Sequence, residues 1–237
     1  MNRDVQACVL LALGTAGLTT SLTGTYAAYV KPSLLPYLVA SCIALLVLAL
    51  APYVSELRRR SSAEDEPEHE HGVRIAWLLL LPTLVLMLIA PPALGASAAK
   101  NDSGVVTAAD LDLARLPPIP AGDPVELTLL DVGMRAPFPD VGGLAGRTVK
   151  LVGFAEPRSD GGWYLTRISI ACCAADALAV KVDAQGVPPP AADSWVEVVG
   201  TIAAAAVGEP PVLIVESVTP VSEPQFPYLL RGGQGFT

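Results

Sequence analysis

The sequence predicts an α-helical membrane region followed by a separate all-β domain. Two observations lead to this division. Between Val5 and Tyr53 the only charged residue is Lys31, whereas from residue 100 onward the composition resembles that of a soluble domain rich in Val, Gly and Pro. Over the whole chain 16% of the residues are charged, below the roughly one quarter of ordinary globular domains. We therefore expect a membrane region over residues 1–99, a Pro-rich spacer over 100–124 and a β domain over 125–237.

Two apolar segments, residues 5–29 and 33–54, are each long enough to cross the roughly 30 Å hydrocarbon core of a bilayer as a helix. Only residues 30–32 separate them, which predicts a tight helical hairpin. Small residues such as Gly14 and Gly17 favour close helix packing in lipid. A cleaved signal peptide fits less well, because the first apolar run is long and a second follows at once.

A third span is predicted over residues 75–96, after a charged linker over residues 55–74. Its apolar core from Ile75 to Ala90 is short for a span, so an interfacial or re-entrant segment is the alternative. The tripeptide Ala96-Ser97-Ala98 also resembles a signal-peptidase site.

The placement of Lys and Arg predicts the orientation in the membrane. On one side fall Arg3, Arg58, Arg59, Arg60 and Arg74, and on the other fall Lys31 and Lys100. The positive-inside rule assigns the arginine-rich side to the cytoplasm. With three spans, we expect a multi-pass protein of the cell membrane whose C-terminal domain lies outside the cytoplasm.

Runs of alternating and β-branched residues recur in the C-terminal domain, separated by turn signals. The runs cover residues 125–130, 147–156, 163–171, 177–182, 195–202 and 212–221. Five or six short strands in a domain of this size are typical of a small barrel. Gly153 and Gly200, in the middle of two runs, fit the sharp bends that such a barrel needs. An OB-like closed barrel is the first expectation, and a small β-sandwich is the second.

The charge of the β domain argues against a nucleic-acid partner. Residues 100–237 hold nine Lys/Arg and sixteen Asp/Glu. An acidic domain of this kind lacks the positive surface that attracts phosphate backbones or anionic lipid. Its aromatic residues are few, and we expect Trp163 and Trp195 to pack in the core or at its rim.

Cys172 and Cys173 are adjacent at the end of a β run, with Asp176 close by. In a regular strand neighbouring side chains point to opposite faces, so the two thiols share a metal ion only if the backbone turns or bulges there. Three interpretations remain open: structural packing of free cysteines, a thiolate site for a divalent or soft metal or metalloid ion, and a redox-active vicinal disulfide on the oxidising side of the membrane. Only the last would make the chain an enzyme.

His69 and His71 flank Glu70 in the acidic linker and form a second candidate set of metal ligands. The alternative is a solvated acidic loop. The predicted topology separates these residues from the β domain by the membrane. The β domain itself contains no His, which excludes a Ser–His–Asp triad or a Cys–His pair within it. We therefore expect no catalytic residues, and no cofactor beyond such an ion.

Several segments along most of the chain resemble a known family. They are Tyr29-Val30-Lys31-Pro32, Pro36-Tyr37-Leu38, Ala76-Trp77-Leu78-Leu79-Leu80-Leu81-Pro82, Ala90-Pro91-Pro92-Ala93-Leu94-Gly95-Ala96, Val152-Gly153-Phe154, Cys172-Cys173-Ala174-Ala175-Asp176-Ala177 and Trp195-Val196. The Cys-Cys-Ala-Ala-Asp-Ala run is the most specific. In these segments the chain resembles the YcgQ-like family of bacterial membrane proteins, which have a conserved C-terminal β domain and are described as subunits of two-component permeases.

This resemblance implies a non-enzymatic accessory subunit beside a larger integral-membrane permease subunit. The first two predicted spans contain no ionisable residue in their interiors, which fits an anchor better than a solute path. The β domain would then recognise a ligand or help the complex to assemble. The alternative function is that of a membrane-anchored protein that uses Cys172 and Cys173 for metal or metalloid binding or for thiol redox chemistry.

Overall fold

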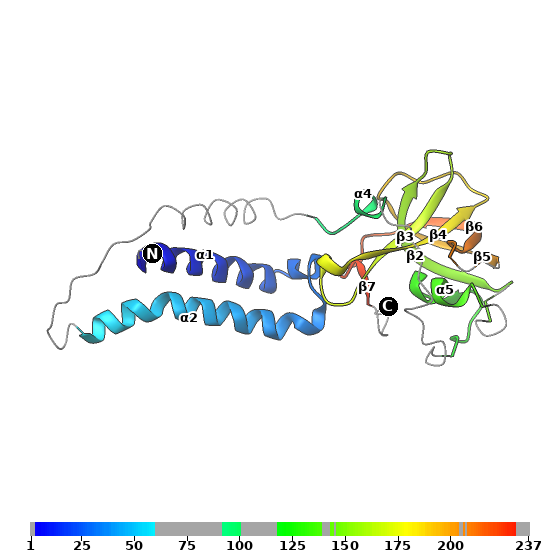
Figure 1. Ribbon diagram of the computed structural model, residues 1–237. Coiled ribbons are helices and arrows are strands. Elements are labelled where there is room, and N and C mark those ends of the chain that lie inside the picture. Colours follow the sequence, from blue (N-terminus) through cyan, green and yellow to red (C-terminus); the bar gives the residue numbers. More distant parts are fainter. Residues whose placement is uncertain are drawn as a thin grey trace. The chain divides into compact units, whose positions relative to one another are not determined.

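The structure is a computed structural model that describes residues 3–59, 92–100, 118–138, 143–144, 146–203, 206 and 208–230 (Figure 1). The chain divides between Pro92 and Ala93 into two compact units, an N-terminal helical unit and a C-terminal unit built on one β-sheet. The predicted linker histidines His69 and His71 and most of the predicted third span, residues 75–96, lie outside the described residues.

The N-terminal unit is a helical hairpin. Helix α1 (Arg3–Leu22) is followed by the 3₁₀ turns η1 (Thr25–Ala28) and η2 (Pro32–Leu34) and by helix α2 (Leu35–Arg59). The two long helices lie side by side (Figure 1). They approach closely because α1 has glycines at the contact: a Cβ atom on Gly14 would lie only 2.9 Å from Leu46 Cδ2, and one on Gly17 only 2.5 Å from Cys42 Sγ.

One helical segment in the described part of the chain is long and apolar enough to cross a membrane by length and composition. It covers Pro32–Ser55, with a mean hydropathy of 2.5. The apolar part of α1, Gln6–Leu22, is shorter. The predicted first span continues to Tyr29, but α1 ends at Leu22 and Gly24 adopts a left-handed φ of 81°, which no α-helix contains.

The C-terminal unit contains a seven-stranded sheet. The strands are β1 (Val125–Glu126), β2 (Thr148–Pro157), β3 (Trp163–Ile170), β4 (Leu178–Gln185), β5 (Trp195–Ala203), β6 (Val212–Pro220) and β7 (Tyr228–Leu230). Their order is β1-β2-β5-β6-β4-β3-β7, with an additional pairing between β2 and β3. Strands β2, β5, β6, β4 and β3 therefore each pair with two others of this group. The β4–β6 pairing is parallel, and the other pairings within the group are antiparallel.

Five of the six predicted β runs are confirmed as β2 to β6 with small shifts at their ends. The run predicted over residues 125–130 is only partly a strand, because β1 stops at Glu126 and helix α5 (Leu129–Arg135) begins. Thr128 and Asp131 form a capping box at the start of this helix, in which each side chain accepts a hydrogen bond from the other residue's backbone N–H. The pattern Thr-x-x-Asp was the signal for this helix.

Two hydrophobic clusters hold the C-terminal unit together. The larger one lies between the strands and α5 and includes Leu129, Leu151, Trp163, Leu165 and Val198. The smaller one packs Ala96 and Ala99 of the short helix α4 (Ala96–Ala99) against residues of β2, β3 and β7, among them Phe154, Ile168 and Tyr228. The Asp193 carboxylate accepts a hydrogen bond from Ala96 N at 2.5 Å, so the chain from Ala93 onward is part of this unit.

Two glycines allow strands to approach more closely than side chains permit. A Cβ atom on Gly153 in β2 would lie 2.7 Å from Thr166 O in β3. One on Gly200 in β5 would overlap the backbone of Ile214 in β6, beside the register shift at Val199/Gly200. The structure thus gives these glycines a role in close contact between neighbouring strands, while the sharp bends expected of them remain a prediction.

We expect the substitution Gly153→Ala to lower the free energy of unfolding by about 1–3 kcal/mol, because the new methyl group can be accommodated only if β2 and β3 move apart. Thermal unfolding of the full chain in detergent measures this change. The matched control is Thr219→Ala, at an exposed position of β6. An equal or higher melting temperature for Gly153→Ala than for the control would show that the two strands are not in such close contact.

Candidate functional site

The loop between β3 and β4 contains the predicted residues Cys172, Cys173 and Asp176. Strand β3 ends at Ile170, so neither cysteine belongs to it. Cys172 lies in a bend, and Cys173 has extended backbone angles and precedes the 3₁₀ turn η5 (Ala174–Asp176). Asp176 N donates to Cys173 O at 3.1 Å, which closes the turn. The backbone therefore turns at the position where a shared site requires it to turn.

The Asp176 carboxylate holds this loop against the end of β3. Its Oδ1 accepts a hydrogen bond from Ala171 N and its Oδ2 accepts one from Cys172 N, both at 2.8 Å. These two N–H groups come directly after the last residue of β3, beyond the last hydrogen-bonded pair with a neighbouring strand. A carboxylate is the strongest side-chain acceptor for such donors, so Asp176 fixes the direction in which the chain leaves the strand.

The two thiols lie on the same side of the loop. Cys172 Sγ and Cys173 Sγ are 3.6 Å apart, and one ligand atom from each of Cys172, Cys173 and Asp176 lies within 4.8 Å of the others. Both cysteines are free thiols. Cys172 is exposed, whereas Cys173 and Asp176 are half-buried. The three residues predicted as a set of metal ligands are thus brought together by five consecutive positions of the chain.

Neighbouring groups in the loop stabilise the protonated form of the Cys172 thiol. The hydrogen bond to the Asp176 carboxylate and the neighbouring Cys173 thiol raise the pKa of Cys172 to about 11. Partial burial works against the charge of Asp176, but hydrogen bonds from the Cys172 thiol and from the backbone N–H groups of residues 171–173 outweigh it and lower the pKa of Asp176 to about 2. At neutral pH the loop therefore holds a carboxylate and a protonated thiol.

The spacing of these donors suits a soft or borderline metal ion. Zinc–thiolate bonds of about 2.3 Å in a tetrahedral site place two sulfur atoms roughly 3.7 Å apart, close to the 3.6 Å observed. Two sulfurs and one carboxylate oxygen supply three ligands, which leaves a fourth position open. The exposed side of Cys172 makes that position accessible from solvent.

The predicted ligands His69 and His71 lie outside the described residues. Cys8 and Cys42 belong to the helical hairpin, where Cys42 is buried against Gly17. Cys42 behaves as the small apolar residue that free cysteine usually is.

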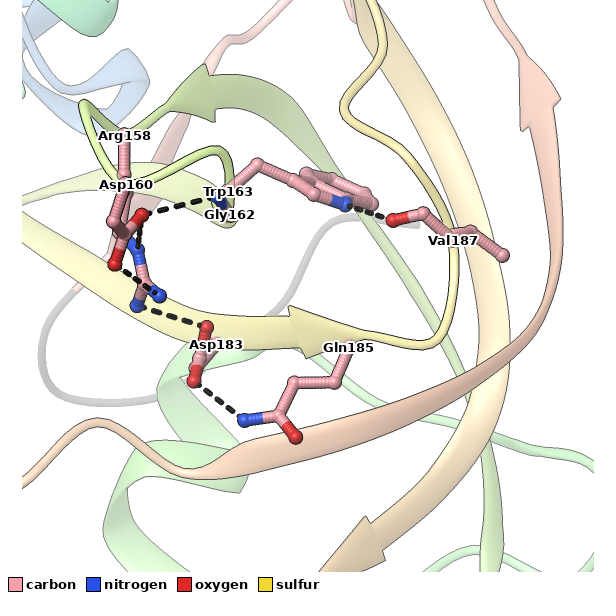
Figure 2. Close-up of polar contacts among 7 residues, drawn as sticks. All are labelled: Arg158, Asp160, Gly162, Trp163, Asp183, Gln185 and Val187. Atoms are coloured by element: carbon pink, nitrogen blue, oxygen red, sulfur yellow. Dashed lines mark hydrogen bonds and ion pairs between the residues drawn. The ribbon is translucent and has the colours of Figure 1, made fainter.

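A polar cluster that the sequence did not suggest lies on β4 and on the turn between β2 and β3 (Figure 2). Arg158 Nη1 contacts Asp183 Oδ1 at 3.0 Å, and its Nη2 contacts Asp160 Oδ2 at 2.9 Å. Gln185 Nε2 donates to Asp183 Oδ2 at 2.8 Å. Hydrogen bonding to Asp160 is the main reason that the pKa of Arg158 is raised. Because these groups satisfy one another, we assign the cluster to fixing the turn and not to ligand binding.

A buried ion pair joins β4 to β2. Lys181 Nζ and Glu156 Oε1 are 3.0 Å apart, and Thr166 Oγ1 donates to Glu156 Oε2 at 3.0 Å. Lys181 and Glu156 are each only 4% exposed. No sequence signal marks this pair, because Lys and Glu are ordinarily surface residues. Each of its charges has its partner within the fold, so this pair too has a structural role.

We expect Asp176→Asn to make Cys172 react faster with iodoacetamide at mildly alkaline pH. Removing the carboxylate's charge brings the raised pKa of Cys172 down towards the roughly 8.5 of an ordinary thiol, so the thiolate fraction at pH about 8.5 rises more than about tenfold. Mass spectrometry of the Cys172 peptide over a pH series measures the midpoint. Asp183→Asn is the control, since it removes a half-buried carboxylate elsewhere in the sheet. An unchanged midpoint in Asp176→Asn would show that the carboxylate does not act on this thiol.

Comparison with known proteins gave one match. No curated protein and no solved structure was found to be similar to this chain. Residues 139–231 match the family model described as the DUF1980 C-terminal domain. The matched segment includes strands β2 to β7 and the loop with Cys172, Cys173 and Asp176. The chain thus contains a region similar to the DUF1980 C-terminal domain, in keeping with the expectation of a family that shares this part of the molecule.

Proposed function

We propose that this chain is a membrane-anchored, non-enzymatic protein whose C-terminal domain binds a soft or borderline metal or metalloid ion through Cys172, Cys173 and Asp176. The observation that supports this proposal is the convergence of the three side chains within 4.8 Å. A pair of packed structural cysteines requires no nearby carboxylate and no exposed thiol, yet Cys172 is exposed and lies beside Asp176.

The chemistry of the donors favours thiophilic ions. Thiolates select ions such as Zn²⁺ and Cu⁺ over Mg²⁺ and Ca²⁺, which prefer oxygen ligands. The β domain contains no His, so the domain offers no imidazole for the remaining position. Water or a donor from a partner molecule would complete the coordination.

We expect the full chain, purified in detergent with reductant, to bind one Cd²⁺ or Zn²⁺ ion per molecule. Cys172→Ser and Cys173→Ser should each abolish the ultraviolet sulfur-to-cadmium band and the bound metal. Asp176→Asn should weaken binding by at least the roughly 10–100-fold that loss of an outer-shell partner costs. Metal analysis after gel filtration and a competition titration with a chelator provide these measurements.

Cys8→Ser and Cys42→Ser are matched controls for this experiment, because they remove thiols of the helical hairpin. Equal metal content in the wild type and in the Cys172 and Cys173 variants would reject the proposal. Thiol counting on material from the native membrane separates it from the redox alternative. A standing Cys172–Cys173 disulfide in that material would favour the redox function over metal binding.

The arrangement of strands supports a proposal about the fold of the binding domain. The ring of pairings β2-β5-β6-β4-β3-β2, with one parallel step between β4 and β6, is the arrangement expected of an OB-like barrel. We propose that the domain is such a barrel. The Gly153→Ala substitution tests the close approach of β2 and β3 on which closure of the ring depends.

A second candidate function is that of an accessory subunit of a membrane permease. The apolar segment Pro32–Ser55 contains no Asp, Glu, Lys, Arg or His. Large apolar side chains spaced three or four residues apart are exposed along α2. These are Ile43, Val47, Leu50 and Val54. Such a helix serves as an anchor or a surface for another helix, but it offers no polar path for a solute.

We propose a multi-pass membrane protein with its C-terminal domain outside the cytoplasm.

We expect an affinity-tagged chain, solubilised gently from its native membrane, to co-purify with a larger integral-membrane protein. Quantitative mass spectrometry against an untagged strain identifies the partner. A helical hairpin alone, fused to the same tag, is the control that shows whether the helices suffice for association. Recovery of the chain without any enriched membrane protein would contradict the subunit function while leaving the metal-binding proposal intact.

A further inference from the structure

Arg167 is a buried cation without a carboxylate partner in the described part of the chain. Arg167 is 8% exposed, and the other buried cation of this region, Lys181, is 4% exposed. Lys181 is neutralised by Glu156 at 3.0 Å, but Arg167 forms no ion pair with a described residue. Taking a charge out of water without an opposite charge carries a large desolvation penalty. Such an arrangement requires a physical explanation.

The position of Arg167 in the sheet is unusual. Thr166 is the last β3 residue that pairs with β2, and Ile168 is the first that pairs with β7. Arg167 therefore lies at the junction where one neighbouring strand leaves this edge of β3 and the next begins. On its other edge β3 remains paired with β4, where Arg167 is opposite Val180.

Neutral groups fix the guanidinium of Arg167 at this junction. Its Nε donates to Pro227 O at 3.1 Å and its Nη1 donates to Val152 O at 3.4 Å. The guanidinium carbon lies 4.9 Å from the centre of the half-buried Trp195 ring. Nη2 makes no hydrogen bond to the described residues, but it is not among their fully buried unpaired atoms, so it keeps some contact with solvent. The guanidinium is thus held by neutral groups, and its Nη2 remains as a donor that a ligand could use.

Burial lowers the pKa of Arg167 to about 10, which still leaves the side chain charged at neutral pH. A fixed guanidinium edge matches the two oxygens of a carboxylate or phosphate group, and its planar fork loses little freedom on binding. The aromatic face of Trp195 excludes water from one side of the guanidinium and so strengthens the attraction.

We propose that the guanidinium of Arg167, beside Trp195, binds the oxyanion group of a small acidic ligand. That group is a carboxylate or a phosphate. This site is separate from the Cys172–Cys173–Asp176 site, and its residues come from β3, β5 and the segment before β7. The acidic net charge of the domain disfavours polyanions. It does not prevent a single oxyanion from binding to a locally uncompensated cation.

The first experiment is a tryptophan-fluorescence titration of the full chain in detergent at constant ionic strength. Separate arms use sodium phosphate, sodium acetate and sodium chloride. We expect a saturable change with phosphate, acetate or both, which identifies the group that is bound, and none with chloride. Arg167→Lys should weaken the response at least about tenfold, because it keeps the charge but loses the fork. Arg147→Gln, which removes a cation that donates to Gly122 O, should leave the response unchanged.

The second experiment needs no substitution at Arg167 and so does not depend on the stability of a variant. Phenylglyoxal modifies guanidinium groups, and mass spectrometry reports modification of the Arg167 and Arg147 peptides separately. We expect phosphate or acetate to slow modification of Arg167 at least about threefold relative to chloride and to leave Arg147 unaffected. Equal protection of both arginines, no protection of Arg167, or a fluorescence response that Arg167→Lys retains would each overturn the proposal. A purely structural Arg167 would give these results.

Discussion

Strand β2 changes partner along its length, and the geometry of the C-terminal domain depends on that change. Residues 148–154 pair with β5, and residues 154–157 pair with β3. Gly153 stands directly before the residue that both partners share, and the absence of its side chain lets Thr166 O come within 2.7 Å of where a Cβ would be. A side chain at Gly153 would push β3 away from β2. The additional pairing between these two strands would then be lost.

The two candidate ligand sites are both consequences of where β3 loses its neighbours. β3 parts from β2 after Thr166, and Arg167 occupies the vacated edge before β7 begins. At the end of β3, the backbone N–H groups of Ala171 and Cys172 have no strand partner, and the Asp176 carboxylate accepts both hydrogen bonds. In each case a charged side chain satisfies backbone groups near the place where a ladder ends. The charges of Arg158 and Lys181, by contrast, are neutralised by partners within the fold.

The sequence predicted the strands well because their alternation and β-branched residues are local features. It did not predict α5, since Leu129 and Leu130 continue the apolar run of β1 and only the Thr128–Asp131 spacing marks a helix start. β7 has three residues, too few for a periodic pattern. Cys172, Cys173 and Asp176 were identified from their residue types and their closeness in the chain. Their convergence depends on β3 ending at Ile170. The alternation of apolar residues along a strand does not locate such a boundary to within one residue. Arg167 was missed because its isolation from carboxylates results from tertiary pairing alone.

The loop after β3 has a consequence for how quickly a bound ion could be exchanged. All of its donor atoms come from one stretch of five residues, 172–176, and the hydrogen bonds of Asp176 hold that stretch in shape. Closing so short a loop costs little chain entropy, and no distant segments have to meet for the donors to assemble. An ion could therefore enter and leave while the hydrophobic clusters of the domain stay intact. The proposed site would in this respect differ from sites whose ions hold distant parts of a chain together, because those ions leave only when the fold opens.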